Sequence, residues 1–189
     1  MKNAIISIIV LLAATAAVAQ TNYYPNTTGT IVKSEYTYNY RNPMWFGGVE
    51  EPTEILLYNA DSRYLDTKFA YKDGSEMDVD TELGLDFTDV YTDKSLTERQ
   101  IADMINACFS SQQRVALRDK HMYYEVRIDT STGKVADVYF RFDRSGPLMN
   151  IPVETYRSIE LALKKNLSVT LTAEGRRRNY IQRFWQHKF

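Results

Sequence analysis

Aromatic side chains gathered in one short stretch are the most promising candidates for ligand binding. Within eleven residues the chain carries Tyr36, Tyr38, Tyr40, Trp45 and Phe46. Aromatic rings offer rigid apolar area, and tyrosine and tryptophan add a polar group, which suits the binding of a sugar or a protein partner. The alternative is structural, since β-rich domains also fill their cores and cross-strand pairs with aromatic residues. Both interpretations remain open from the sequence.

Metal-binding residue types are present, but their spacing does not fit a site. The chain has two histidines, His121 and His187, and the single cysteine Cys108. A zinc site requires three or four ligands in a fixed geometry. Acidic residues alternate over 76–82, an arrangement that could offer oxygen ligands to calcium, but Thr81 stands where an EF-hand loop requires glycine. We therefore expect no metal and no cofactor, and a solvated strand edge at 76–82.

Motifs for nucleophilic catalysis and phosphate binding are missing from the sequence. It contains no Gly-x-Ser-x-Gly nucleophile motif, no Gly-x-Gly-x-x-Gly and no phosphate-binding loop. With 24 acidic residues a pair of carboxylates exists somewhere in any fold, so glycosidase chemistry gains no support from their number. A net charge of −1 argues against a general nucleic-acid binder. No catalytic residue is predicted.

The first 19 residues have the pattern of a secretory signal peptide. A single lysine precedes an apolar run over 4–12, and Ala17 and Ala19 provide the small-x-small site before Gln20. A membrane-spanning helix would require about 20 apolar residues, and no second long apolar segment follows. We expect cleavage after Ala19 and a free periplasmic or extracellular protein. No cysteine follows the small residues, so we expect no lipoprotein.

Residue alternation predicts the strands of the mature chain. Residues 20–30 are polar and predict a flexible leader, and an α+β domain is expected over 31–189. Aromatic and β-branched residues at every second position indicate half-buried strands. Strands are predicted at Ile31–Tyr40, Ile55–Tyr58, Tyr64–Tyr71, Tyr123–Asp129, Lys134–Phe142 and Ser168–Thr172. The turn Thr130-Ser131-Thr132-Gly133 should join two of these strands in a hairpin.

Two helices are predicted from their capping residues and apolar stripes. Ser95-Leu96-Thr97-Glu98 fits a capping box that would begin the first helix. The apolar stripe of that helix places Cys108 in the core. Pro152 suits the first position of the second helix, because its missing N–H would have had no partner there. The core stripes are Ile101, Ile105, Cys108 and Phe109 in the first helix, and Tyr156, Ile159 and Leu163 in the second.

The C-terminal segment is ambiguous. Ala173-Glu174-Gly175 predicts a hairpin loop, and residues 176–187 then predict a strand that returns along Ser168–Thr172. A helix is the alternative, since Tyr180, Ile181, Phe184 and Trp185 also fit helical spacing. The elements do not alternate regularly between strand and helix. The predicted fold class is therefore α+β, a mainly antiparallel sheet packed with two helices in a single domain.

Three stretches of the C-terminal half resemble a known family. They are Gly133-Lys134-Val135-Ala136-Asp137-Val138-Tyr139-Phe140, Ile151-Pro152-Val153-Glu154-Thr155-Tyr156-Arg157-Ser158-Ile159-Glu160, and Thr172-Ala173-Glu174-Gly175-Arg176 with Asn179-Tyr180-Ile181. Over about residues 50–189 the chain resembles small secreted bacterial proteins that form a domain family of unknown function. The shared motifs are structural, so the resemblance implies no catalytic residue.

The sequence thus favours an exported, non-catalytic domain that binds a protein or a cell-envelope partner. The alternative function is a carbohydrate-binding or glycan-active protein that uses the Tyr36–Phe46 aromatics. If those rings pack inward, the carbohydrate hypothesis loses its support.

Overall fold

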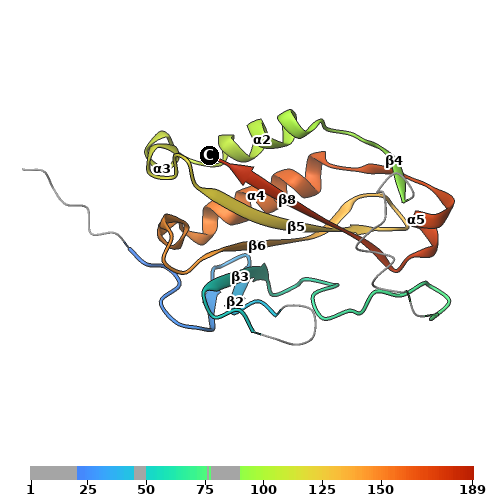
Figure 1. The fold of residues 1–189 in the computed structure, drawn as a ribbon, viewed down its shortest axis with the longest axis horizontal. Coiled ribbons are helices and arrows are strands. Elements are labelled where there is room, and N and C mark those ends of the chain that lie inside the picture. The colour runs from blue at the N-terminus through green and yellow to red at the C-terminus, as the bar shows by residue number, and fades with distance from the viewer. Residues whose placement is uncertain (1–20, 45–49, 76, 78–89) are drawn as a thin grey trace, which may run out of the picture.

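The computed structural model describes residues 21–44, 50–75, 77 and 90–189. A six-stranded antiparallel sheet in the order β1-β2-β3-β6-β5-β8 forms the centre, and helices α2 and α4 run along one side of it (Figure 1). This confirms the predicted α+β class. The six strands are β1 (Gly29–Val32), β2 (Thr37–Arg41), β3 (Glu54–Asn59), β5 (His121–Asp129), β6 (Val135–Asp143) and β8 (Tyr180–Lys188).

The remaining elements surround this sheet. A small two-stranded sheet pairs β4 (Tyr91–Lys94) with β7 (Val169–Leu171). The helices are α2 (Glu98–Ala107), α3 (Ser111–Ala116), α4 (Val153–Asn166), α5 (Ala173–Arg177) and the 3-10 turn η2 (Pro147–Asn150). The short helices α3 and α5 were not predicted, because each has too few residues to show an apolar period.

The core lies between α4 and one face of the sheet. Successive residues of a strand point to opposite faces, so Phe140 and Phe142 of β6 face α4 while the residues between them face away. Tyr156 stacks on Phe142 at an interplanar angle of 12° and lies 5.0 Å from the ring centre of Phe140. Ile159 and Leu163 complete the stripe and are fully buried. The predicted core stripe of this helix is confirmed.

The strand expected over Ile31–Tyr40 divides into a hairpin. Strand β1 ends at Val32, and β2 begins at Thr37, which pairs with Val32. The backbone N–H of Lys33 donates to the carbonyl of Tyr36 at 2.9 Å and closes the turn. Side-chain alternation continues through this turn, so the pattern did not reveal the reversal.

Helix α2 begins two residues later than the capping box at Ser95 predicted. Thr97 caps it, with reciprocal hydrogen bonds to Gln100. Ser95 is engaged elsewhere: its hydroxyl donates to the Asn166 carbonyl at 2.7 Å and accepts from the Ser168 N–H at 2.8 Å. Thr97-x-x-Gln100 therefore forms the capping box, whereas Ser95 contacts the end of α4 and the residue before β7.

The predicted inward stripe of α2 is largely confirmed. Ile101 and Ile105 are 1% exposed and Phe109 is buried. Cys108 ends the helix and is half-buried against the core.

The hairpin between β5 and β6 forms as predicted. Gly133 has a positive φ of 71°, and a Cβ atom there would lie 2.3 Å from the Val169 carbonyl oxygen. Glycine is therefore required both for the backbone conformation and for the close approach of β7.

The strand predicted over 176–187 is present as β8, which begins at Tyr180, but it has a different partner. Strand β8 pairs with β5, and β7 pairs with β4. The expected loop at Ala173–Gly175 is the start of α5, capped by the Thr172 hydroxyl, which accepts from the Gly175 N–H at 3.0 Å. The helix turns the chain away from β7, and the hairpin prediction for 168–187 was wrong.

Residues 23–27, part of the segment 20–30 for which a flexible leader is predicted, make several contacts with the domain. Tyr24 is fully buried, and its hydroxyl donates to the Ile151 carbonyl at 3.0 Å. Arg144 holds the next residues, donating to the carbonyls of Asn26 at 2.7 Å and Thr27 at 2.9 Å. A single buried ring within a polar stretch gave no periodic signal.

Candidate functional site

The face of the sheet that points away from α4 carries a groove of about 770 Å³. We call it the sheet groove. Its volume falls within the range of about 300–1,000 Å³ that is usual for ligand sites. Its described lining comprises basic residues (Arg41, Lys68, Arg127, Arg141), acidic residues (Glu54, Asp66, Glu125), aromatic residues (Phe69, Tyr123, Tyr139, Tyr180, Phe184) and the other residues Pro43, Met44, Leu56, Leu65, Thr67 and Gln182.

Strand register arranges the floor of the sheet groove in rows that cross the strands. Four residues stand opposite one another in the first row, and three more occupy the next row on β6, β5 and β8. The first row is Arg41, Leu56, Arg141 and Tyr123, and the second is Tyr139, Glu125 and Phe184. These rows bring charged and aromatic side chains together from segments that are far apart in the chain.

Each described carboxylate of the groove is paired with an arginine. Arg141 Nη2 lies 2.7 Å from Glu54 Oε2, and Arg41 Nη2 lies 3.0 Å from Asp66 Oδ1. Arg127 Nε donates to Glu125 in the third pair. Each of these carboxylates therefore accepts from a guanidinium group, a charge-assisted contact that orients both side chains.

The Glu125–Arg127 pair belongs to the floor of the sheet groove. Burial raises the pKa of Glu125, and the Arg127 guanidinium opposes that rise. Arg127 also lies 4.4 Å from the ring centre of Tyr180 and donates to the Tyr64 carbonyl at 3.3 Å. Because the guanidinium contacts a carboxylate, a ring and a backbone carbonyl at once, its position is fixed by the fold.

One wall of the sheet groove is the segment expected as the strand Tyr64–Tyr71. It contains no strand, and side chains of the sheet satisfy its backbone. Asp137 accepts from the Tyr64 N–H at 2.8 Å, the Tyr180 hydroxyl donates to the Thr67 carbonyl at 2.7 Å, and Asn179 donates to the Lys68 carbonyl at 2.7 Å. These contacts replace a strand ladder and place Leu65–Phe69 beside the sheet.

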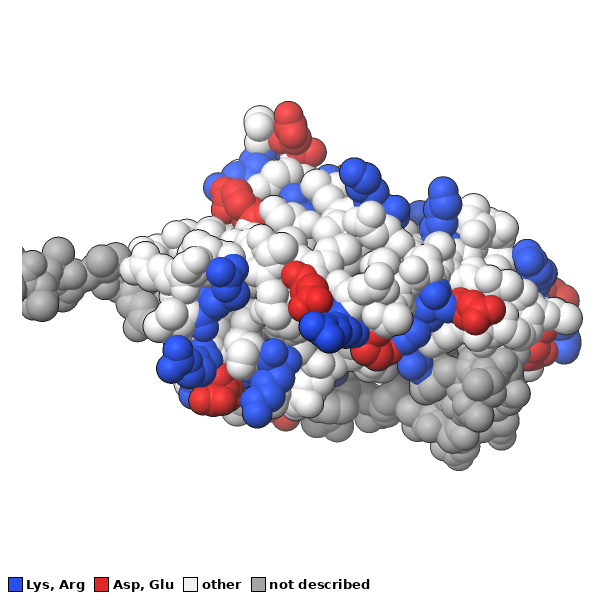
Figure 2. Space-filling view, turned by 90° about the horizontal axis from the view of Figure 1, so that it is seen from above, with Lys and Arg blue, Asp and Glu red and all other residues white. Residues whose placement is uncertain are grey.

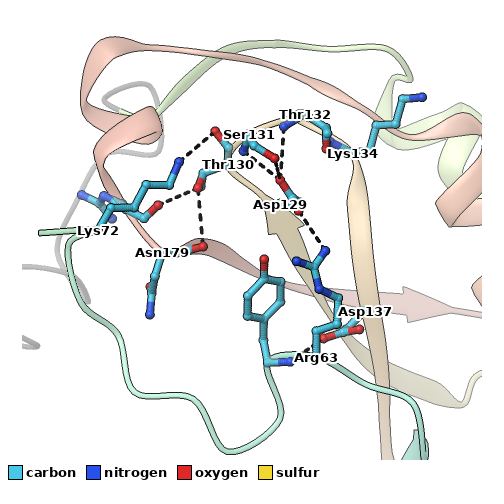
Figure 3. Close-up of polar contacts among 11 residues, drawn as sticks. Arg63, Lys72, Asp129, Thr130, Ser131, Thr132, Lys134, Asp137 and Asn179 are labelled. Atoms are coloured by element: carbon cyan, nitrogen blue, oxygen red, sulfur yellow. Dashed lines mark hydrogen bonds and ion pairs between the residues drawn. The ribbon is translucent and has the colours of Figure 1, made fainter. Parts of the chain in front are cut away.

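The wall is anchored at the β5–β6 hairpin, as Figure 3 shows around Asp129. Arg63 Nη1 lies 2.9 Å from Asp129 Oδ2, and the same carboxylate accepts from the backbone of Ser131 and Thr132. Burial alone would raise the pKa of Asp129, but the hydrogen bonds from Ser131 and Arg63 lower it to about 2. At the other end of the view, Lys72 donates to the Thr130 carbonyl at 3.5 Å.

The three described residues of the aromatic set predicted as a ligand surface, Tyr36, Tyr38 and Tyr40, do not line the sheet groove. Tyr38 and Tyr40 are 0% and 5% exposed and belong to the core. Tyr36 is half-buried, with its ring 5.3 Å from the Arg157 guanidinium carbon. Trp45 and Phe46 lie outside the described residues. Two of the five rings are thus occupied by packing, which is the structural alternative that the sequence left open.

The histidines and the cysteine do not converge on a site. His121 is exposed at the start of β5, whereas His187 is buried with Nε2 3.1 Å from Asn106 Oδ1, and this burial lowers its pKa. Burial raises the pKa of Cys108, whose Sγ lies 3.4 Å from the Met104 carbonyl. Across the described parts of the chain, no group of three potential metal ligands comes together. Most of the acidic stretch 76–82 lies outside those parts.

Sequence reasoning missed the groove residues although a signal was present. In β5 and β6, Glu125, Arg127 and Arg141 alternate with apolar core residues. Charged residues at every second position of two central strands indicate a polar sheet face. The pattern could not show that a loop more than fifty residues earlier in the chain would wall this face into a groove.

No helix within the described residues is long and apolar enough to cross a bilayer.

Comparison with known proteins supports the fold and adds no activity. A model for a domain of unknown function, DUF5043, matches residues 20–185. The crystal structure of a DUF5043 family protein from Bacteroides uniformis ATCC 8492 is similar, with a TM-score of 0.73 and 24% identity over 87% of this chain and 86% of that one. No curated protein matches. The resemblance to a family of unknown function is confirmed, and by the extent of the match this chain belongs to the DUF5043 family.

Proposed function

We propose that this protein is an exported, non-catalytic domain that binds a protein or cell-envelope partner through the sheet groove. The proposal includes cleavage after Ala19 and release into the periplasm or the extracellular space. The observation that supports it is a groove that combines exposed aromatic side chains with arginines that pair with every acidic residue of its described lining.

Exposed apolar residues line the sheet groove. Met44 is 57% exposed, Tyr123 47% and Phe184 51%. Methionine, aromatic residues and arginine are the types enriched at protein–protein interfaces. Each of these three side chains exposes apolar area that the fold leaves uncovered, and a partner that covered this area would gain hydrophobic stabilisation.

The side of the molecule that carries the helices provides controls. Seen from above the helices, basic and acidic side chains are interspersed over the surface (Figure 2). Leu161 of α4 is 49% exposed and Val115 of α3 is 66% exposed, and neither lines the sheet groove. These two residues provide matched controls for apolar substitutions.

A pull-down tests the proposal. Immobilised mature protein beginning at Gln20 is incubated with the native envelope fraction and, in a separate arm, with a glycan panel. We expect the unaltered protein and the control Val115→Ala/Leu161→Ala to retain the same envelope component. The variant Tyr123→Ala/Phe184→Ala should lose at least nine-tenths of it.

Two results would count against the proposal. Equal retention by the groove variant and the control would show that binding occurs elsewhere. Retention of a glycan, with no protein or envelope component bound, would favour the carbohydrate alternative. Loss of that glycan in the groove variant would then assign its binding to Tyr123 and Phe184. Mass spectrometry of the exported protein tests the location, since we expect its N-terminus at Gln20.

A further inference from the structure

The charges of the sheet groove do not balance. Four basic residues line it against three acidic ones, and all three acidic residues are engaged in ion pairs. Lys68 is exposed, and no carboxylate within the described residues pairs with it. A groove with neutralised carboxylates and a surplus ammonium group is complementary to an anionic ligand.

Arg41 is the second available cation. Its partner Asp66 has a side chain that is 76% exposed, so the pair is a surface ion pair, which water screens strongly. Its Nε is shielded from solvent and has no hydrogen-bond acceptor among the described residues. A carboxylate that replaced Asp66 would accept from Nη2, the atom that makes the exposed ion pair, in a charge-assisted hydrogen bond.

The distance to the exposed aromatic residues follows from the register. Arg41 on β2 and Tyr123 on β5 stand in one row, separated by β3 and β6. Neighbouring strands are about 4.8 Å apart, so three steps correspond to roughly 14 Å. An extended peptide advances about 3.3–3.6 Å per residue and covers this distance in about four residues. Residues i and i+4 of an extended chain also point to the same side.

We infer that the sheet groove binds an extended peptide segment that crosses the strands and carries an acidic residue four positions from an apolar or aromatic one. The carboxylate is bound by Arg41 and Lys68, and the apolar side chain packs on Tyr123 and Phe184. This inference rests on the proposed function and adds the chemistry and the spacing of the partner segment.

Fluorescence anisotropy with short labelled peptides tests the inference on the mature protein. The probe carries glutamate and phenylalanine at positions i and i+4 in a serine–threonine background. Three matched peptides replace glutamate by glutamine, replace it by lysine, or shorten the spacing to i+3. We expect the probe to bind at least tenfold more tightly than each of the three, because i+3 places the two side chains on opposite sides.

Protein variants assign the carboxylate contact. Arg41→Gln and Lys68→Gln should each lower the affinity for the probe at least fivefold and leave the affinity for the glutamine peptide unchanged. The exposed control Arg176→Gln should change neither affinity. Lys68 lies on an exposed loop, so its variant keeps the test valid if Arg41→Gln lowers the melting temperature.

Other outcomes overturn the inference. Equal affinity for the glutamine peptide would show that the groove does not recognise a carboxylate. Equal affinity for the i+3 peptide would show that the i, i+4 spacing is not required. Tighter binding of an oligomer of uronic acid than of any peptide would replace the peptide by a glycan. If no peptide binds while retention of the envelope component still depends on Tyr123 and Phe184, this inference fails and the proposed function stands.

Discussion

Glu160 shows how single residues hold charge inside this protein. Its side chain is 0% exposed, yet it pairs with Lys164 Nζ at 2.6 Å and Arg157 Nη1 at 2.8 Å and accepts from the Tyr38 hydroxyl and the Asn59 amide. Burial alone would raise the pKa of Glu160, but Lys164, Tyr38 and Arg157 together lower it. This buried carboxylate joins α4 to β2 and β3, because it accepts from Tyr38 of β2 and from Asn59 of β3.

Removal of this carboxylate should destabilise the protein. Glu160→Ala leaves the Tyr38 hydroxyl and the Asn59 amide buried without their acceptor, and breaking a buried ion pair costs roughly 3–5 kcal/mol. The exposed pair Lys33–Glu154 is the control, since Glu154→Ala should change the free energy of unfolding by about 1 kcal/mol or less. Urea unfolding measures both, and equal losses would show that burial of Glu160 has no special effect.

Asp129 gives the stability a defined acid dependence. Its folded pKa of about 2 lies below its ordinary value of roughly 3.9. The unfolded chain therefore takes up this proton first as the pH falls, so the contribution is complete above about pH 5 and declines toward pH 2. Asp129→Asn should flatten the fall of unfolding free energy between pH 5 and 2, measured by urea titrations at each pH. An unchanged slope would contradict the assignment.

Helices and strands show which parts of the fold the sequence can predict. The β5–β6 hairpin was predictable because its turn carries a glycine at a positive φ, and the α4 stripe because it repeats over fourteen residues. The pairing of β8 with β5 was not predictable, because no local residue pattern distinguishes β5 from β7 as the partner of β8. The same holds for the sheet groove. The alternation of charged and apolar residues in β5 and β6 was a local signal for its charged floor, whereas its wall depends on long-range contacts such as that of the Tyr64 N–H with Asp137.

Packing of α2 against the core can be measured directly. Ile105 is 1% exposed, so Ile105→Ala should lower the free energy of unfolding by roughly 2–5 kcal/mol through lost burial and the cavity left behind. Asp103 lies on the exposed side of the same helix, and Asp103→Ala should cost about 0.5 kcal/mol or less. A loss at Ile105 no larger than at Asp103 would mean that the helix does not pack as described.

At the scale of the whole molecule, the N-terminal residues are joined to elements far along the chain. The Tyr24 ring lies 5.5 Å from Tyr40, 5.6 Å from Phe142 and 6.2 Å from Tyr156, measured between ring centres. These three partners belong to β2, β6 and α4. One side chain near the start of the described chain therefore closes an aromatic cluster built from three separate elements.

Loss of this ring should be costly despite its position near the end of the chain. Tyr24→Ala removes a fully buried aromatic side chain, for which about 3–5 kcal/mol is typical. Tyr23→Ala removes a neighbour that is 40% exposed and should cost less than about 1 kcal/mol. Thermal and urea unfolding of both variants, each beginning at Gln20, make the comparison. Similar melting temperatures would show that the segment is only loosely held.

The placement of β8 at the edge of the sheet, beside β5, determines how one side of a central strand is covered. The nine residues of β8, Tyr180–Lys188, supply the whole outer neighbour of β5 and the Trp185 ring that stacks on Tyr124. Without them, one edge of a central strand would be open to solvent. Pairing with β8 therefore protects an edge of β5 whose backbone groups could otherwise pair with another chain.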